Sequence, residues 1–156
     1  MTRMCEDLDC DYCFRNNFAA SDARKVACWS DERHNGVLPR QVTKLSHKLY
    51  WFTCDGPCGG HHFQISPASI TNGQRCPFCA GRQLCNDTDC EYCFSHSFAA
   101  SDDRKVACWS AECNSGVTPR QVSIRSNKKF WFTCNGHCGG HNFQAGLLNT
   151  TGCPYC

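Results

Sequence analysis

Cysteine is the residue type that most limits what this chain can fold into, because 17 of its 156 residues are cysteine. The cysteines recur in register: a shift of 80 residues places residues 5–64 on residues 85–144 without a gap, and 39 of these 60 positions are identical. Each half then closes with a Cys-Pro-aromatic-Cys turn, after eleven further residues in the first half and eight in the second. The chain is therefore a tandem repeat, and we predict one domain at residues 1–80 and a second at residues 81–156.

The apolar composition is too low for one large hydrophobic core. Hydrophobic residues make up 41% of the chain, but this figure includes the cysteines. Small domains with thin cores need disulfides or metals for stability, which disfavours an ordinary enzyme. No apolar run approaches the roughly 20 residues that span a bilayer, and the acidic segment 6–11 does not resemble a secretion signal. We therefore expect no membrane association and a reducing intracellular compartment, where cysteine clusters bind metals.

The spacing of the cysteines predicts two zinc sites in each repeat, about four Zn²⁺ per chain. Short Cys-x-x-Cys and Cys-x-x-x-Cys turns direct two sulfurs to one point, and zinc takes four ligands in a tetrahedron. The first predicted site of each repeat flanks a hairpin that runs through Trp51-Phe52-Thr53 and His62-Phe63-Gln64 in repeat 1, with glycines at the turn. We call these the closing sites, and their predicted ligands are Cys54, Cys58, Cys76 and Cys79 in repeat 1 and Cys134, Cys138, Cys153 and Cys156 in repeat 2.

The second predicted site of each repeat, the lead site, uses the cysteines that precede the hairpin. Its fourth ligand is inferred only from its equal placement in both repeats, in a short helical segment at residues 23–29 that Ser21-Asp22 would cap. A buried cysteine without a metal is the alternative for that position. The predicted lead ligands are Cys5, Cys10, Cys13 and Cys28 in repeat 1 and Cys85, Cys90, Cys93 and Cys108 in repeat 2.

Several alternatives remain open at this stage. His61 and His141 recur in Gly-Gly-His, and either could replace Cys58 or Cys138 as a ligand or support the site from outside. Disulfide bonds are a further alternative, because the eight matched cysteines of each repeat could also pair with one another. The unmatched Cys113 could be a spare ligand, an intermolecular thiol or a residue without a role. The histidines at 34 and 47 have no histidine counterpart in repeat 2, which predicts surface positions.

These residues resemble a known family, the probable zinc-ribbon or treble-clef-like repeat domain. The resemblance rests on a series of elements that covers nearly the whole chain twice and runs in repeat 1 as Trp29, Pro39-x-x-Val42, Ser46, Tyr50-Trp51-Phe52-x-Cys54, Gly60-His61-x-Phe63 and Cys76-Pro77-x-Cys79. It implies a zinc-binding fold of the kind found in bacteria and, as tandem arrays with three extra leading cysteines, in giant DNA viruses such as mimivirus and marseillevirus. We accordingly predict a small, zinc-stabilised α+β fold made of two tandem treble-clef-like repeats, each with a short hairpin and one short helix.

The charge pattern predicts a binding function. The formal net charge is +2, and sixteen thiolates on four zinc ions would lower it to about −6. The chain therefore cannot bind nucleic acid as a nonspecific polycation. Basic residues nevertheless gather before the aromatic strand of each repeat, and a local patch is what phosphate binding requires; a solvated strand face is the alternative. The predicted nucleic-acid-binding residues are Arg40, Lys44, Lys48, Arg120, Arg125, Lys128 and Lys129.

We thus expect a non-enzymatic zinc protein that binds nucleic acid, with DNA as the leading partner. We expect no small-molecule substrate. The alternative is a protein-binding role, as a virion or scaffold component, with a homodimer as one form of self-association. If the chain is viral, we expect it in the virion and in the cytoplasm or nucleus of the infected cell. A metal-dependent nuclease has less support, because His62 of the pair His61-His62 becomes Asn142 in repeat 2 and closed four-cysteine sites leave zinc no position for water.

Overall fold

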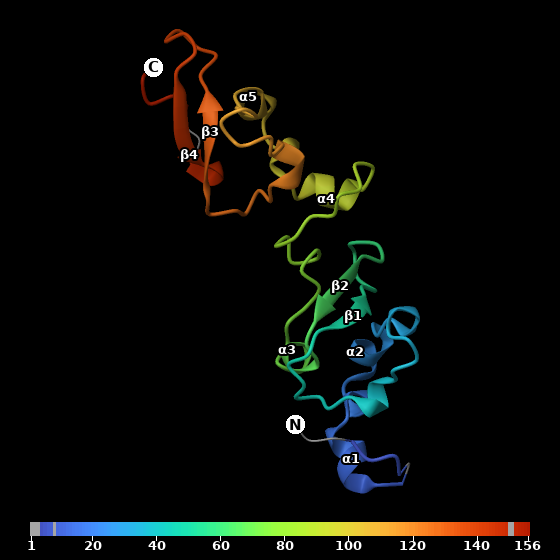
Figure 1. Ribbon diagram of the computed structural model, residues 1–156. Helices are drawn as coiled ribbons and strands as arrows, with labels where there is room; N and C mark the ends of the chain where they lie inside the picture. The colour runs from blue at the N-terminus through green and yellow to red at the C-terminus, as the bar shows by residue number, and fades with distance from the viewer. Residues whose placement is uncertain (1–3, 8, 150–151) are drawn as a thin grey trace. The chain divides into compact units, whose positions relative to one another are not determined.

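The computed structural model describes residues 4–7, 9–149 and 152–156. The chain divides into two compact units, unit 1 (Met1–Cys76) and unit 2 (Pro77–Cys156). Each unit contains a two-stranded antiparallel hairpin and short helices (Figure 1). The two tandem α+β repeats predicted from the sequence are therefore present, with more than the one short helix per repeat that we expected.

The units divide earlier than the predicted break after residue 80. Residues 77–82 belong to unit 2 because the hydroxyls of that unit bind their carbonyl groups. Tyr92 Oη donates to the Cys79 carbonyl oxygen over 3.2 Å, and Ser123 Oγ donates to the Gly81 carbonyl oxygen over 2.6 Å.

Unit 1 contains helix α1 (Asp11–Asn16), helix α2 (Ala23–Ala27), strands β1 (Tyr50–Thr53) and β2 (His62–Ile65), and helix α3 (Pro67–Thr71). The β-branched and aromatic composition of the strands favours the hairpin, in which Phe52 pairs with Phe63. Asp22 caps α2 as predicted, because its carboxylate accepts the Arg24 backbone N–H over 2.9 Å.

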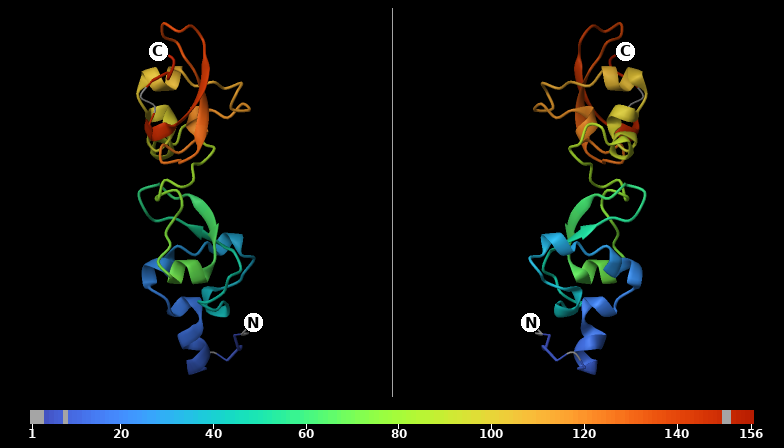
Figure 2. Two further views of the ribbon diagram at one scale, coloured as in Figure 1. Left: turned by 90° about the vertical axis from the view of Figure 1, so that its left-hand side faces the viewer. Right: turned by 90° about the vertical axis from the view of Figure 1, so that its right-hand side faces the viewer.

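Unit 2 repeats this order with helix α4 (Glu91–Ser95), helix α5 (Asp103–Ala107) and strands β3 (Lys129–Thr133) and β4 (Asn142–Gly146). Figures 1 and 2 both show α5 beside the β3–β4 hairpin. A single 3₁₀ turn at Leu147–Asn149 follows β4 where unit 1 has α3. The shorter spacing before Cys153, eight residues instead of eleven, removes the room for a helix here.

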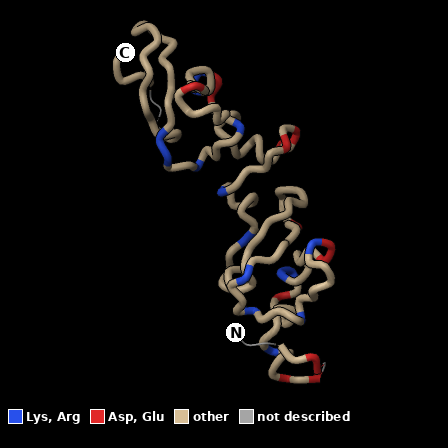
Figure 3. The backbone as a smooth tube through the Cα atoms, viewed as in Figure 1, with Lys and Arg blue, Asp and Glu red and all other residues tan. Residues whose placement is uncertain are grey.

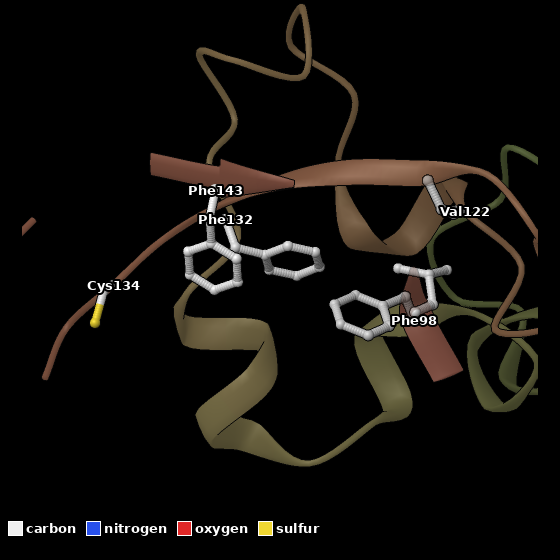
Figure 4. Packing of buried hydrophobic residues seen from close by; sticks show 6 residues of the cluster. Phe98, Val122, Phe132, Cys134 and Phe143 are labelled. Carbon is white, nitrogen blue, oxygen red and sulfur yellow. The ribbon is translucent and has the colours of Figure 1, made fainter. Parts of the chain in front are cut away.

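The core of each unit is a small aromatic cluster under the hairpin. In unit 2, Phe132 is 1% exposed and its ring centroid lies 5.9 Å from that of Phe98 and 5.8 Å from that of Phe143. Figure 4 shows this cluster, with Phe132 beside Phe143 and Phe98 beside Val122. Phe18, Trp29, Phe52 and Phe63 pack in the same way in unit 1. Such a core is too small to stabilise a domain alone, so each unit depends on its cysteine clusters.

His34 corrects the prediction that it lies on the surface. Its ring is buried against Trp29, with 4.2 Å between the centroids, and its Nε2 lies 2.8 Å from the Trp51 carbonyl oxygen. Asn114 takes the same place in unit 2 and donates to the Trp131 carbonyl oxygen over 2.9 Å. The two residues differ in sequence but hold the same part of the hairpin.

Among the residues that the structure describes, no helix has the length and apolar character needed to cross a membrane.

Candidate metal centres

The closing cluster of repeat 1 brings together the four cysteines predicted for it. Cys54 directly follows β1, Cys58 precedes two glycines with positive φ, Gly59 and Gly60, and the Cys76–Cys79 turn supplies the other two thiols. All four sulfur atoms lie within 4.8 Å of one another, and Cys58 Sγ lies 3.7 Å from Cys76 Sγ. Sulfurs about 2.3 Å from a tetrahedral zinc ion are about 3.8 Å apart, so these positions suit Zn²⁺.

The closing cluster of repeat 2 has the same geometry. Cys134 Sγ lies 3.5 Å from Cys156 Sγ, and Cys138 Sγ lies 3.4 Å from Cys153 Sγ. Backbone N–H groups point at these sulfurs, since Gly136 N–H donates to Cys134 Sγ over 3.3 Å. Such N–H···S bonds favour the thiolate, which is the form that binds zinc.

Each lead cluster contains three of the four cysteines predicted for it. Cys5, Cys10 and Cys13 lie within 4.8 Å of one another in unit 1, and Cys85, Cys90 and Cys93 do so in unit 2. The last cysteine of each triplet is buried on its helix, Cys13 on α1 and Cys93 on α4. Three thiolates can fill three corners of a zinc tetrahedron, which leaves one corner for a ligand from outside the triplet.

The fourth ligands that we predicted, Cys28 and Cys108, lie elsewhere. Cys28 Sγ donates to the Asp55 carboxylate over 3.4 Å, and Cys108 Sγ lies 3.3 Å from Asn135 Oδ1. Burial and the hydrogen bond to Asp55 raise the pKa of the Cys28 thiol, which favours the protonated form over a zinc ligand. The reason is the local fold: the Thr53 N–H donates to the Cys28 carbonyl oxygen over 2.7 Å and fixes Cys28 beside the end of β1.

The clustered thiols require a cation to ionise together. Hydrogen bonding to Cys13 and Cys10 raises the pKa of Cys5 to about 11. Burial raises the pKa of Cys93 to about 12. In the other direction, a hydrogen bond from Cys138 lowers the pKa of Cys156 to about 7. Crowded thiols therefore hold protons that a divalent ion would displace.

Disulfides do not form in this structure, since all 17 cysteines are free thiols. The sulfur–sulfur distances of 3.1 to 3.7 Å given by the hydrogen-bonded pairs exceed the bond length of about 2.05 Å in a disulfide. Together the four clusters fit Zn²⁺, about four ions per chain.

His61 and His141 do not replace Cys58 and Cys138, because both closing clusters already contain four thiols. Their backbone carbonyl groups accept hydrogen bonds from the N–H groups of Cys54 and Cys134 over 2.9 Å. The Cys113 thiol is exposed, outside all four clusters.

Two of the predicted phosphate-binding residues donate hydrogen bonds to the loops that carry the first lead cysteines of each unit. Arg40 donates to the Asp7 carbonyl oxygen over 2.9 Å, and Arg120 donates to the Asp87 carbonyl oxygen over 2.6 Å. The Arg120 guanidinium also approaches Cys85 Sγ to 3.8 Å. These arginines brace the loops that carry the lead cysteines, and their contact with nucleic acid stays a prediction. Lys44 is likewise held, by the Arg15 carbonyl oxygen over 2.8 Å.

The remaining basic residues of the prediction are exposed: Lys48 in unit 1, and Arg125, Lys128 and Lys129 in unit 2. Arg82, which the sequence reasoning missed, joins Arg125 and Lys128 in lining one groove of unit 2. Its place three residues after the closing turn of repeat 1 gave no signal of that groove. Figure 3 shows basic residues at the start of β3 and acidic residues on the lead loop before α4.

The comparisons with known proteins agree with this geometry. The model of the probable treble clef zinc finger domain matches residues 26–82 and 105–156. An uncharacterized protein of Acanthamoeba polyphaga mimivirus is 32% identical over 142 residues, a match that covers 88% of this chain and 32% of the viral protein. The chain thus spans about a third of the length of that relative. Each region matched by the model contains a hairpin and a complete closing cluster, and the lead triplets lie outside both.

Proposed function

The chain belongs to the probable treble clef zinc finger domain family, and from this premise we propose that it is a non-enzymatic zinc protein that binds nucleic acid, DNA in the first place. Four-thiolate closing clusters support a structural role for zinc, because saturated coordination leaves no position for a reacting water. In this proposal, the protein surface that zinc stabilises binds the nucleic acid.

A basic groove in unit 2 is the observation that carries this proposal. The groove has a volume of about 800 Å³, and Arg82, Arg125 and Lys128 lie in its wall. No acidic residue is among the described residues that line it. The exposed Lys129 follows directly at the start of β3. Three cations in a wall whose described residues include no carboxylate, with Lys129 next in the chain, provide the local positive potential that attracts a phosphate backbone.

The corresponding groove of unit 1 is less suited to phosphate. Glu6 lies in its wall together with Arg40 and Lys48. Arg40 is held by the Asp7 carbonyl oxygen, and the Lys48 ammonium lies 5.7 Å from the centroid of the Tyr50 ring. We therefore assign the stronger nucleic-acid contact to unit 2.

Salt dependence tests the proposal. Four phosphate contacts on duplex DNA predict a slope of roughly −3.6 in a plot of log K against log salt, or about a 100-fold loss of affinity between 50 and 200 mM salt. Fluorescence anisotropy with a labelled duplex would measure it. Absence of binding at low salt, or binding that does not weaken as salt rises, would contradict the phosphate contact.

A charge-matched pair of double variants locates the contact. Lys128→Glu with Lys129→Glu removes two cations from the unit 2 surface, and Arg24→Glu with Lys25→Glu makes the same change of net charge on α2. We expect the first pair to weaken binding by more than 10-fold and to flatten the salt slope by about two contacts, while the second pair changes little. Equal losses would mean that net charge alone attracts the DNA.

A scaffold or virion component that binds other proteins is the second candidate. Large apolar side chains that are exposed favour it, among them Tyr12 (64%), Phe14 (63%) and Tyr155 (66%). Either function fits a reducing compartment, which the 17 free thiols support. The viral relative supports a place in a virion or an infected cell, where fractionation of infected cells would test it.

A further inference from the structure

Within unit 2, the segment that ends repeat 1 lies against the helix that carries the next lead cluster. Tyr92, on α4 between Cys90 and Cys93, donates its hydroxyl to the Cys79 carbonyl oxygen over 3.2 Å. Gly81, two residues further, has φ +64, and a Cβ atom added there would lie 3.5 Å from His96 Cδ2. The surface beside α4 is thus a fitted seat for a Cys-Pro-aromatic-Cys turn and the residues that follow it.

Unit 1 has the same seat, and it is uncovered in the part of the chain that the structure describes. Tyr12 corresponds to Tyr92 and occupies the same place between the lead cysteines on α1. Its side chain is 64% exposed, whereas Tyr92 is half-buried. The groove beside the seat is also larger, about 1100 Å³ in unit 1 against about 800 Å³ in unit 2, where Ala80, Gly81 and Arg82 form part of the wall.

The matching turn is uncovered in repeat 2. Phe78, the aromatic residue of the first Cys-Pro-aromatic-Cys turn, is 6% exposed, and its counterpart Tyr155 is 66% exposed. Cys79 is half-buried, whereas Cys156 is exposed. The Tyr155 ring contacts the His141 ring, with 5.2 Å between their centroids, and most of its surface is still exposed. Unit 2 therefore has a filled seat and an exposed turn, and unit 1 has an exposed seat of the same kind.

We propose that a second copy of this chain docks head to tail, with the Cys153–Cys156 turn of one copy on the α1 surface of the next. The Tyr12 hydroxyl donates to a backbone oxygen of Cys156 in the partner copy, as the Tyr92 hydroxyl does to that of Cys79 within one chain. Tyr155 packs against the apolar wall of the groove, where the exposed Leu45 lies. Because the two surfaces differ, the contact is heterologous and can repeat from copy to copy. It does not involve Lys128 or Lys129 and is independent of the proposed DNA binding.

Sedimentation velocity of the reduced, zinc-loaded chain over a wide range of concentration tests this inference. We expect dimers and longer species to grow with concentration. Tyr12→Phe, which removes only the hydroxyl, should weaken each contact by about 2- to 10-fold, as for the loss of one hydrogen bond. Tyr12→Ala and Tyr155→Ala should each remain monomeric. Circular dichroism and zinc content should match the wild type, because both side chains are exposed; Phe14→Ala, beside Tyr12 on α1, is the control that should still associate.

Mixing the two defective variants gives the decisive result. The chain with Tyr12→Ala keeps its turn and the chain with Tyr155→Ala keeps its seat, so the mixture should form a 1:1 dimer that grows no further. A mixture that stays monomeric would overturn the proposal, as would self-association that survives both substitutions. A wild type that is monomeric at every concentration would also overturn it, and would leave the seat to a further repeat of the same polypeptide.

Discussion

Replacement of one closing-cluster thiol tests the central claim that zinc stabilises each unit. Cys134 lies at the end of β3, is 7% exposed, and has its sulfur 3.5 Å from Cys156 Sγ. Cys134→Ser removes one of four thiolates. A structural zinc contributes about 10–16 kcal/mol of apparent binding energy in small domains, which equals or exceeds the 5–15 kcal/mol or so by which whole domains are stable. We therefore expect unit 2 to lose its closing zinc and its folded hairpin.

Cys108→Ser is the matched control, because it makes the same atomic change in the same unit. The Cys108 thiol lies 3.3 Å from Asn135 Oδ1, and a serine hydroxyl can donate to that oxygen as well. We expect this variant to change the free energy of unfolding by no more than about 1 kcal/mol, the net value of one hydrogen bond.

Elemental analysis and urea unfolding followed by circular dichroism measure both variants. The wild type and Cys108→Ser should bind about four zinc ions per chain, and Cys134→Ser about three. If Cys108→Ser loses an ion, then Cys108 is a ligand and our placement of it beside Asn135 is wrong. If Cys134→Ser keeps the zinc content and the unfolding midpoint of the wild type, the metal does not hold the unit together.

Three further outcomes follow from the same geometry. A strong chelator under reducing conditions should abolish the folded far-ultraviolet spectrum, and re-addition of zinc should restore it; a native spectrum after metal removal would contradict the claim. Phe132→Ala, at a site that is 1% exposed, should cost about 3–5 kcal/mol in urea unfolding, whereas Phe94→Ala, at a site that is 47% exposed, should cost under 1 kcal/mol or so. Arg120→Met should weaken zinc retention by the lead triplet of unit 2, measured as faster transfer of one zinc ion to a colorimetric chelator; transfer at the wild-type rate would show that the arginine does not brace the loop.

The sequence predicted the closing clusters because their ligands are local. Each pair of cysteines sits on a tight turn, and the hairpin between the pairs is itself evident from its aromatic strands. The fourth lead ligand could not be predicted in this way. Cys28 recurs as regularly as any ligand, but its position depends on the contact between α2 and the end of β1, which no spacing rule reveals. Equal placement in two repeats shows a shared role without showing which role.

Long-range contacts also account for interactions of Arg40 and His34 that the sequence did not predict. Arg40 reaches the carbonyl oxygen of Asp7, 33 positions earlier in the chain, so its guanidinium contacts the loop that carries the lead cysteines of unit 1. His34 and Asn114 appeared unrelated because their side chains differ, yet both hold the carbonyl group of a hairpin tryptophan. Two different side chains can form a hydrogen bond to the same backbone oxygen. An alignment of the two repeats that compares residue types does not detect this equivalence.

The corrected ligand set changes how the chain can attract a phosphate backbone. Fourteen thiolates in the four clusters, against the eight positive charges of four zinc ions, bring the formal charge from +2 to about −4. The loaded protein is therefore acidic overall, and its net charge repels DNA at long range, an effect that salt screens. Binding must then depend on the few cations that face the groove of unit 2 within a Debye length of the phosphates. For this reason the exchange of Lys128 and Lys129, and not a change of net charge elsewhere, should decide whether the chain binds DNA.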